Sequence, residues 1–197
     1  PQVITESLYA LHLDGVAVNE SHTLATRTGR DRILSGLLAP RDGHFHRYLK
    51  DYAIAPRSIR FEMESVHVLR DKTGRPLDDI TGAADNEILL SACLSLAYRL
   101  TRNPKDTVFF SIAGGRKTMS ACLMTAAQLY GRAQDRIYHV LVSPEFENHP
   151  DFYYPPAKPA MLEMTDNRGG KVLRDTASAS VTLVPIPFIP LREAVSD

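Results

Sequence analysis

Apolar residues along the chain follow two alternating patterns, one typical of helices and one typical of short buried strands. Residues 83–101 form the longest helical stretch, with Leu89, Cys93 and Ala97 on one face. Short runs rich in Val, Ile, Leu and Phe lie between the helical stretches and predict strands. The expected helices cover residues 3–11, 31–38, 44–53, 83–101 and 117–130, and the expected strands cover residues 21–26, 65–69, 108–112, 136–142 and 181–189.

This alternation predicts an α/β fold, with a Rossmann-like, mostly parallel sheet flanked by helices. Prolines place the 181–189 strand at a sheet edge. A strand normally precedes the first helix of such a fold, so we expect the first strand to be missing from the printed sequence. The length of 197 residues predicts a single domain over residues 1–197. Residues 145–158 are expected to form an ordered loop, and residues 166–179 a mobile polar segment.

Composition and charge narrow the choice of function. Lys plus Arg and Asp plus Glu number 23 each, whereas proteins that hold long nucleic acids are usually basic. Any nucleic-acid ligand should therefore be short and held in a local pocket. No long apolar run or leader is visible, so we expect a cytoplasmic protein without a membrane partner. The histidines show no metal-ligand spacing, and we expect neither a metal nor a cofactor.

The strand over residues 108–112 ends at Ala113-Gly114-Gly115, and a helix is expected to begin at Lys117. Free backbone amides and the helix dipole favour an anion at such a turn, and Arg116 and Lys117 add positive charge. The run lacks the Gly directly before Lys-Thr that a P-loop requires, and no G-x-G-x-x-G fingerprint is present. These residues alone support an anion site and an ordinary strand-to-helix turn about equally.

Two other features also have a structural and a functional interpretation. Asp85 opens the long helix, where a carboxylate is favourable next to the helix N-terminus. Phe146 lies in an aromatic and proline-rich loop, so that it could stack on a base or anchor the loop to the protein body. The sequence leaves the role of Phe146 open.

Several segments resemble a family of CRISPR-associated Rossmann-fold (CARF) proteins, and together they cover most of the chain. The run SPEFENHPDF at residues 143–152 is quite specific. The matching segments are residues 1–11 (PQVITESLYAL), 85–87 (DNE), 111–119 (SIAGGRKTM), 131–136 (GRAQDR) and 140–155 (VLVSPEFENHPDFYYP).

The resemblance implies a homodimer that binds a cyclic oligoadenylate, foremost cyclic tetra-adenylate, in type III CRISPR immunity. It further implies a metal-independent ring nuclease that cleaves this messenger and switches the signalling off. The printed sequence carries no effector domain, which favours this activity. The alternative is a non-catalytic sensor or binding module that acts with an effector in trans.

In such a ring nuclease, a ribose 2′-hydroxyl attacks the adjacent phosphorus and leaves a cyclic 2′,3′-phosphate and a 5′-hydroxyl. Lys117 and Arg116 are the expected catalytic residues, because they would stabilise negative charge on the phosphoryl oxygens. A loop before residue 1 can supply a further hydroxyl in related ring nucleases. The remaining residues expected to bind the ligand are Ala113, Gly114, Gly115, Thr118, Gln2, Thr5, Thr26, Arg27 and Phe146.

Overall fold

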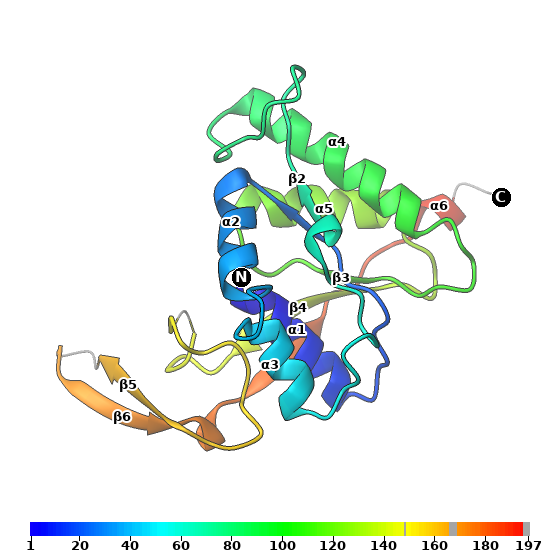
Figure 1. Ribbon diagram of the computed structural model, residues 1–197. Coiled ribbons are helices and arrows are strands. Elements are labelled where there is room, and N and C mark those ends of the chain that lie inside the picture. Colours follow the sequence, from blue (N-terminus) through cyan, green and yellow to red (C-terminus); the bar gives the residue numbers. More distant parts are fainter. Residues whose placement is uncertain (148, 166–168, 195–197) are drawn as a thin grey trace. The chain divides into compact units, whose positions relative to one another are not determined.

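The computed structural model describes residues 1–147, 149–165 and 169–194 (Figure 1). The chain forms two compact units, each of which is described by itself. Unit 1 contains Pro1–Ser21, Ile33–Glu62 and Val140–Leu183, and unit 2 contains His22–Arg32, Met63–His139 and Val184–Asp197. The single domain over residues 1–197 stays a prediction.

Helices and strands confirm the predicted α/β class. The helices are α1 (Gln2–Leu13), α2 (Arg27–Gly36), α3 (His44–Asp51), α4 (Ala83–Leu100), α5 (Lys117–Tyr130) and α6 (Leu191–Ala194). The strands are β1 (Thr23–Ala25), β2 (Val66–Val68), β3 (Phe109–Ser111), β4 (Arg136–Val142), β5 (Met161–Thr165), β6 (Lys171–Asp175) and β7 (Val181–Pro185). The β1–β2 and β3–β4 pairs are parallel, which is consistent with a Rossmann-like fold.

Unit 2 is built on these two parallel pairs and on the helices α4 and α5, which pack side by side (Figure 1). Phe110 of β3 pairs with Ile137 of β4, and both are buried. Ala126 and Ala127 of α5 are fully buried, because their small side chains allow close packing. The core cluster consists of Leu69, Ile80, Leu89, Cys93, Ala97, Phe110, Ala126, Ala127 and Ile137.

A buried ion pair fixes the start of β4 in unit 2. The Asp135 carboxylate is fully buried and accepts hydrogen bonds from the Arg132 backbone and guanidinium and from the Val108 amide, each at 2.8–2.9 Å. The same guanidinium donates to the carbonyls of Asn103 and Asp106 at 2.6 and 3.0 Å. The network therefore links the segment between α4 and β3, which contains Asn103, Asp106 and Val108, to the segment between α5 and β4, which contains Arg132 and Asp135.

In unit 1, α1 and α3 pack together (Figure 1). The fully buried Tyr48 of α3 donates its hydroxyl hydrogen bond to the Leu8 carbonyl of α1 at 3.1 Å. Its ring also meets Tyr154 edge-on, with ring centroids 5.3 Å apart. Tyr154 lies in the segment 145–158, which has no helix or strand among its described residues, as predicted.

Three segments differ most from the sequence-based expectation. Residues 161–175 contain the antiparallel hairpin β5–β6, where residues 166–179 were expected to be mobile; residues 166–168 lie outside the described residues. Helix α2 begins at Arg27 and not at residue 31, because the Thr26 hydroxyl accepts from the Gly29 amide at 3.2 Å and caps the helix. Strand β7 ends at Pro185; it lies at the edge of the order β3-β4-β7, as its prolines predicted.

Within the described residues, no helix has the length and apolar character that crossing a membrane requires.

Candidate anion-binding turn

The turn between β3 and α5 lies where the sequence placed it, between a strand and a helix that begins at Lys117. Gly114 and Gly115 have φ angles of 80° and 73°, in the left-handed region that favours glycine. A Cβ atom on Gly115 would also lie 2.7 Å from the Met119 sulfur. The Ser120 hydroxyl donates to the Ile112 carbonyl at 2.6 Å and thereby ties the first turn of α5 to the end of β3.

This turn is open to solvent and positively charged. Gly114, Gly115, Arg116, Lys117 and Thr118 are all exposed, whereas Ala113 is half-buried. Helix α5 has 14 residues, and no side chain caps its N-terminus. The Met119 amide donates to the Arg116 carbonyl at 2.8 Å. Binding of an anion at the preceding amides, which the helix dipole would favour, stays a prediction.

Arg116 does not stand free at this turn, because it forms a two-pronged ion pair with Asp79. Its Nε donates to Asp79 Oδ1 at 2.8 Å, and its Nη2 contacts Asp79 Oδ2. Asp79 Oδ1 also accepts from the Ile80 amide at 2.8 Å. The hydrogen bond from Arg116 holds the pKa of Asp79 at about 2, so this carboxylate is charged at neutral pH.

The neighbouring Asp78 binds Arg27, another residue expected to bind the ligand. Arg27 Nε lies 2.5 Å from Asp78 Oδ1, and the Arg27 amide donates to the Leu77 carbonyl at 2.7 Å. The Thr28 hydroxyl donates to the Asp78 carbonyl at 3.1 Å. Consecutive carboxylates therefore hold Arg27, which follows β1, and Arg116, which follows β3.

The candidates in unit 1 also contact one another. Gln2 Nε2 donates to the His149 carbonyl at 2.7 Å, which joins the start of α1 to the loop predicted over residues 145–158. Thr5 is fully buried and its hydroxyl donates to the Gln2 carbonyl at 3.0 Å. Phe146 is buried against Phe152, with ring centroids 5.0 Å apart. Anchoring of the loop thus accounts for Phe146, and ligand contacts by Thr5 and Phe146 stay predictions.

The structure therefore brings the start of α1 to His149 in unit 1, and it brings Arg27 and Arg116 to one loop, residues 78–79, in unit 2. Asp85, in contrast, has the structural role that its position indicated: its Oδ2 accepts from the amides of Thr81 and Gly82 at 2.8 and 3.2 Å and caps α4.

Glu6 is a buried titratable group that the sequence did not point out. It lies on α1 with only 6% of its surface exposed. Burial raises the pKa of its carboxyl to about 7, and the Glu147 carboxylate contributes to the increase. The sequence held one indication of this burial, because Glu6 lies within the helix predicted over residues 3–11, next to its apolar face. Its neighbours Thr5 and Ser7 are buried as well.

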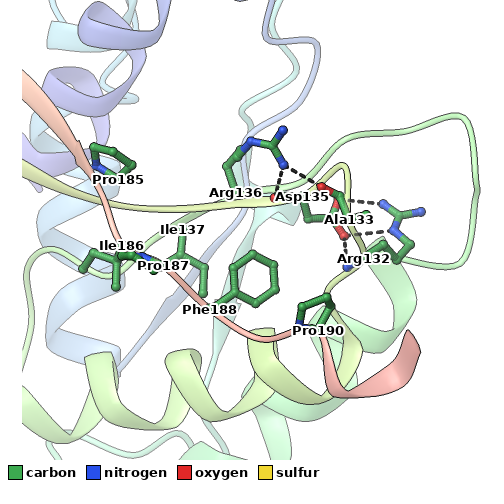
Figure 2. Close-up of a pocket in the computed structure, with 10 residues that line it drawn as sticks. All are labelled: Arg132, Ala133, Asp135, Arg136, Ile137, Pro185, Ile186, Pro187, Phe188 and Pro190. Atoms are coloured by element: carbon green, nitrogen blue, oxygen red, sulfur yellow. Dashed lines mark hydrogen bonds and ion pairs between the residues drawn. The ribbon is translucent and has the colours of Figure 1, made fainter. Parts of the chain in front are cut away.

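A cavity of about 330 Å³ lies elsewhere in unit 2, at the start of β4 (Figure 2). Ile137, Ile186 and Phe188 form its apolar wall together with prolines, and Figure 2 shows the Arg132 and Asp135 side chains bonded to each other at its side. Ligands of parallel α/β sheets bind beyond the carboxyl ends of the strands. Because this cavity adjoins the amino end of β4, it is not the candidate site.

A pair of histidines forms a second polar cluster in unit 2. His22 Nδ1 and His67 Nε2 are 3.1 Å apart, and Arg99 Nη2 lies 3.4 Å from His67 Nε2. Burial lowers the pKa of both imidazoles, and Arg99 lowers them further. Among the described residues, no group of three or more His, Cys, Asp or Glu side chains could hold a metal ion.

Sequence reasoning missed Asp78 and Asp79, although both lie in a loop between a predicted strand and a predicted helix. Their signal was a pair of adjacent carboxylates in an otherwise neutral chain with two unexplained arginine-bearing turns. The pairing itself spans 37 residues between Asp79 and Arg116 and 51 between Arg27 and Asp78, so that no local pattern reveals it.

The fold and this turn define an α/β protein with a candidate site for a phosphate-bearing ligand. A family model described as "CRISPR-associated protein NE0113 (Cas_NE0113)" matches residues 1–197. The chain therefore belongs to this family of CRISPR-associated proteins. No curated protein matches it.

Proposed function

We propose that the chain binds a cyclic oligoadenylate, foremost cyclic tetra-adenylate, and cleaves it as a metal-independent ring nuclease that ends type III CRISPR signalling. The observation that carries the proposal is the open β3–α5 turn in a CRISPR-associated chain. Two left-handed glycines, an uncapped helix N-terminus and the exposed Lys117 are what a phosphodiester needs for recognition. The likeness to CARF proteins supports the choice of ligand.

In this proposal, the amides of the β3–α5 turn hold a phosphate, and Lys117 stabilises charge on its non-bridging oxygens. The adjacent 2′-hydroxyl loses its proton to water and attacks the phosphorus in line, and the bond to the 5′-oxygen breaks as that oxygen takes up a proton from water. The products are a cyclic 2′,3′-phosphate and a 5′-hydroxyl. Arg116 holds a second oxygen of this phosphate, and Arg27 binds a neighbouring phosphate. The active form is a cytoplasmic homodimer, so that a symmetric ring meets two copies of each group.

The test combines ring binding and turnover for Lys117→Ala. Purified protein is incubated with cyclic tri-, tetra- and hexa-adenylate in EDTA, and linear products and bound ring are measured. Lys117→Ala should lose at least about tenfold in kcat/KM or affinity, which corresponds to about 1.4 kcal/mol. Lys105→Ala is the matched control, because Lys105 is also exposed and belongs to the same unit.

The outcomes separate the alternatives. Cleavage by the wild type selects the ring nuclease, and tight binding without cleavage selects the sensor. Binding and turnover by Lys117→Ala at the level of Lys105→Ala would refute the role of the turn. No binding of any ring would refute both functions.

A further inference from the structure

The loop that carries Asp78 and Asp79 is bonded to both arginine-bearing turns of unit 2. Its backbone accepts hydrogen bonds from the Arg27 amide and the Thr28 hydroxyl, at 2.7 and 3.1 Å. Asp79 is oriented by the Ile80 amide at 2.8 Å. The loop therefore has a defined position beside Arg27 that does not depend on its two ion pairs.

Each carboxylate occupies the place on its arginine that a phosphate would take. A phosphate binds a guanidinium through two oxygens and two N–H groups, and Asp79 uses this same two-pronged arrangement on Arg116. Asp78 engages Arg27 through Nε. A phosphate ligand can therefore use these arginines fully only after the carboxylates have moved away.

Exchange of carboxylate for phosphate is feasible because both pairs are open to water. The side chains of Arg27 and Asp78 are 54% and 65% exposed, and those of Arg116 and Asp79 are 55% and 49% exposed. Ion pairs at such exposure are weak and screened by salt. The displaced carboxylates remain hydrated, so no buried charge is left behind.

We propose that Asp78 and Asp79 are internal competitors of the ligand's phosphates, and that their displacement from Arg27 and Arg116 raises the ligand concentration at which the site fills. This inference rests on the proposed function for the identity of the ligand. A single-phosphate compound displaces one carboxylate at a time. An oligoadenylate displaces both, because its second phosphate is delivered within the same complex.

The test measures dissociation constants of Asp78→Asn, Asp79→Asn and the double variant by calorimetry at fixed low salt, with AMP and with cyclic tetra-adenylate. Each single variant should bind the ring about threefold more tightly, and the double variant about tenfold, because the two pairs share no partner. AMP should gain only about threefold in the double variant. Thermal melts confirm that each variant is folded.

The control is the double variant Glu64→Gln/Asp106→Asn, which removes two negative charges at exposed positions of the same unit. It should change affinity for either ligand by less than about twofold. If the Asp78/Asp79 double variant binds the ring no more tightly than this control, the inference is overturned while ring binding by the wild type still supports the proposed function. Weaker binding would also overturn it, since the carboxylates would then be positioning the arginines for the ligand.

A second probe tests whether the carboxylates compete with phosphates when the ligand is not an oligoadenylate. If the wild type and the variants bind no ring, the series is repeated with inorganic pyrophosphate. Tighter pyrophosphate binding by the double variant than by the control would retain the competition and reject the proposed function. Equal binding would reject both.

Discussion

Replacement of Asp135 by Asn tests the buried network that fixes the start of β4. The substitution preserves the size of the side chain but removes its charge and one of its two acceptor oxygens. In the folded protein this side chain is fully buried and accepts from the Val108 amide and from Arg132. In the Asn variant, the Arg132 guanidinium keeps its charge in a buried site, and at least one N–H group loses its acceptor.

Breaking a buried ion pair on one side costs about 3–5 kcal/mol. Since domains are stable by only about 5–15 kcal/mol, Asp135→Asn should lose a large share of the free energy of unfolding. Asp106→Asn is the control: the Asp106 side chain is exposed and accepts from the Asn103 side chain at 3.0 Å, and it acts on Arg132 through its charge, whereas its backbone carbonyl accepts from Arg132 directly. This variant should change stability by less than about 0.5 kcal/mol.

Urea unfolding followed by far-ultraviolet circular dichroism gives both values, because the sequence has no Trp for a fluorescence signal. Equal slopes of the unfolding free energy against urea concentration are needed for the comparison. A loss below about 1 kcal/mol for Asp135→Asn, with an unchanged slope, would refute the argument that this network holds the charge in a dry site.

Two further variants test unit 1. The pKa of Glu6 is raised from 4.5 to about 7, so its contribution to stability is complete below pH 4.5 and is lost as pH rises through 7. The free energy of unfolding of Glu6→Gln, relative to that of the wild type, should therefore increase between pH 5 and pH 8 by up to about 3 kcal/mol. Urea titrations at pH 5 and at pH 8 measure this difference. A difference that is the same at both pH values would contradict the shift. Tyr48→Phe should lower the free energy of unfolding by about 1 kcal/mol, because the buried Tyr48 hydroxyl donates to the Leu8 carbonyl. Tyr98 is 49% exposed, so Tyr98→Phe should leave the free energy of unfolding almost unchanged. Equal melting temperatures for the two variants would contradict this prediction.

The parts of the fold that could be predicted from the sequence are those with strong local boundaries. Helix α5 has the predicted bounds, since Gly114-Gly115 precede it and Gly131 ends it. Strand β4 also has its predicted bounds, before Ser143-Pro144. The hairpin β5–β6 was missed because its strands carry Glu163 and Arg174 among their apolar residues, and only Met164 is buried.

The candidate site could be predicted only to the extent that it is local. The left-handed glycines and the helix start that follow β3 come from a single run of residues. The partners of Arg27 and Arg116 could not be found in this way, because tertiary structure alone brings Asp78 and Asp79 to them. The burial of Thr5 and Phe146 likewise depends on how α1 and the 145–158 loop pack within unit 1.

The prolines of β7 also limit how copies of this chain can associate. An edge strand with free N–H groups is a template for strands of other molecules, which can lead to aggregation. Pro185 lacks an N–H group at the end of β7, and Pro187 and Pro190 follow before α6. Continuous sheet extension across two molecules is therefore disfavoured along this edge. If the proposed homodimer forms, we expect it to use side-chain surfaces and not strand pairing along this edge.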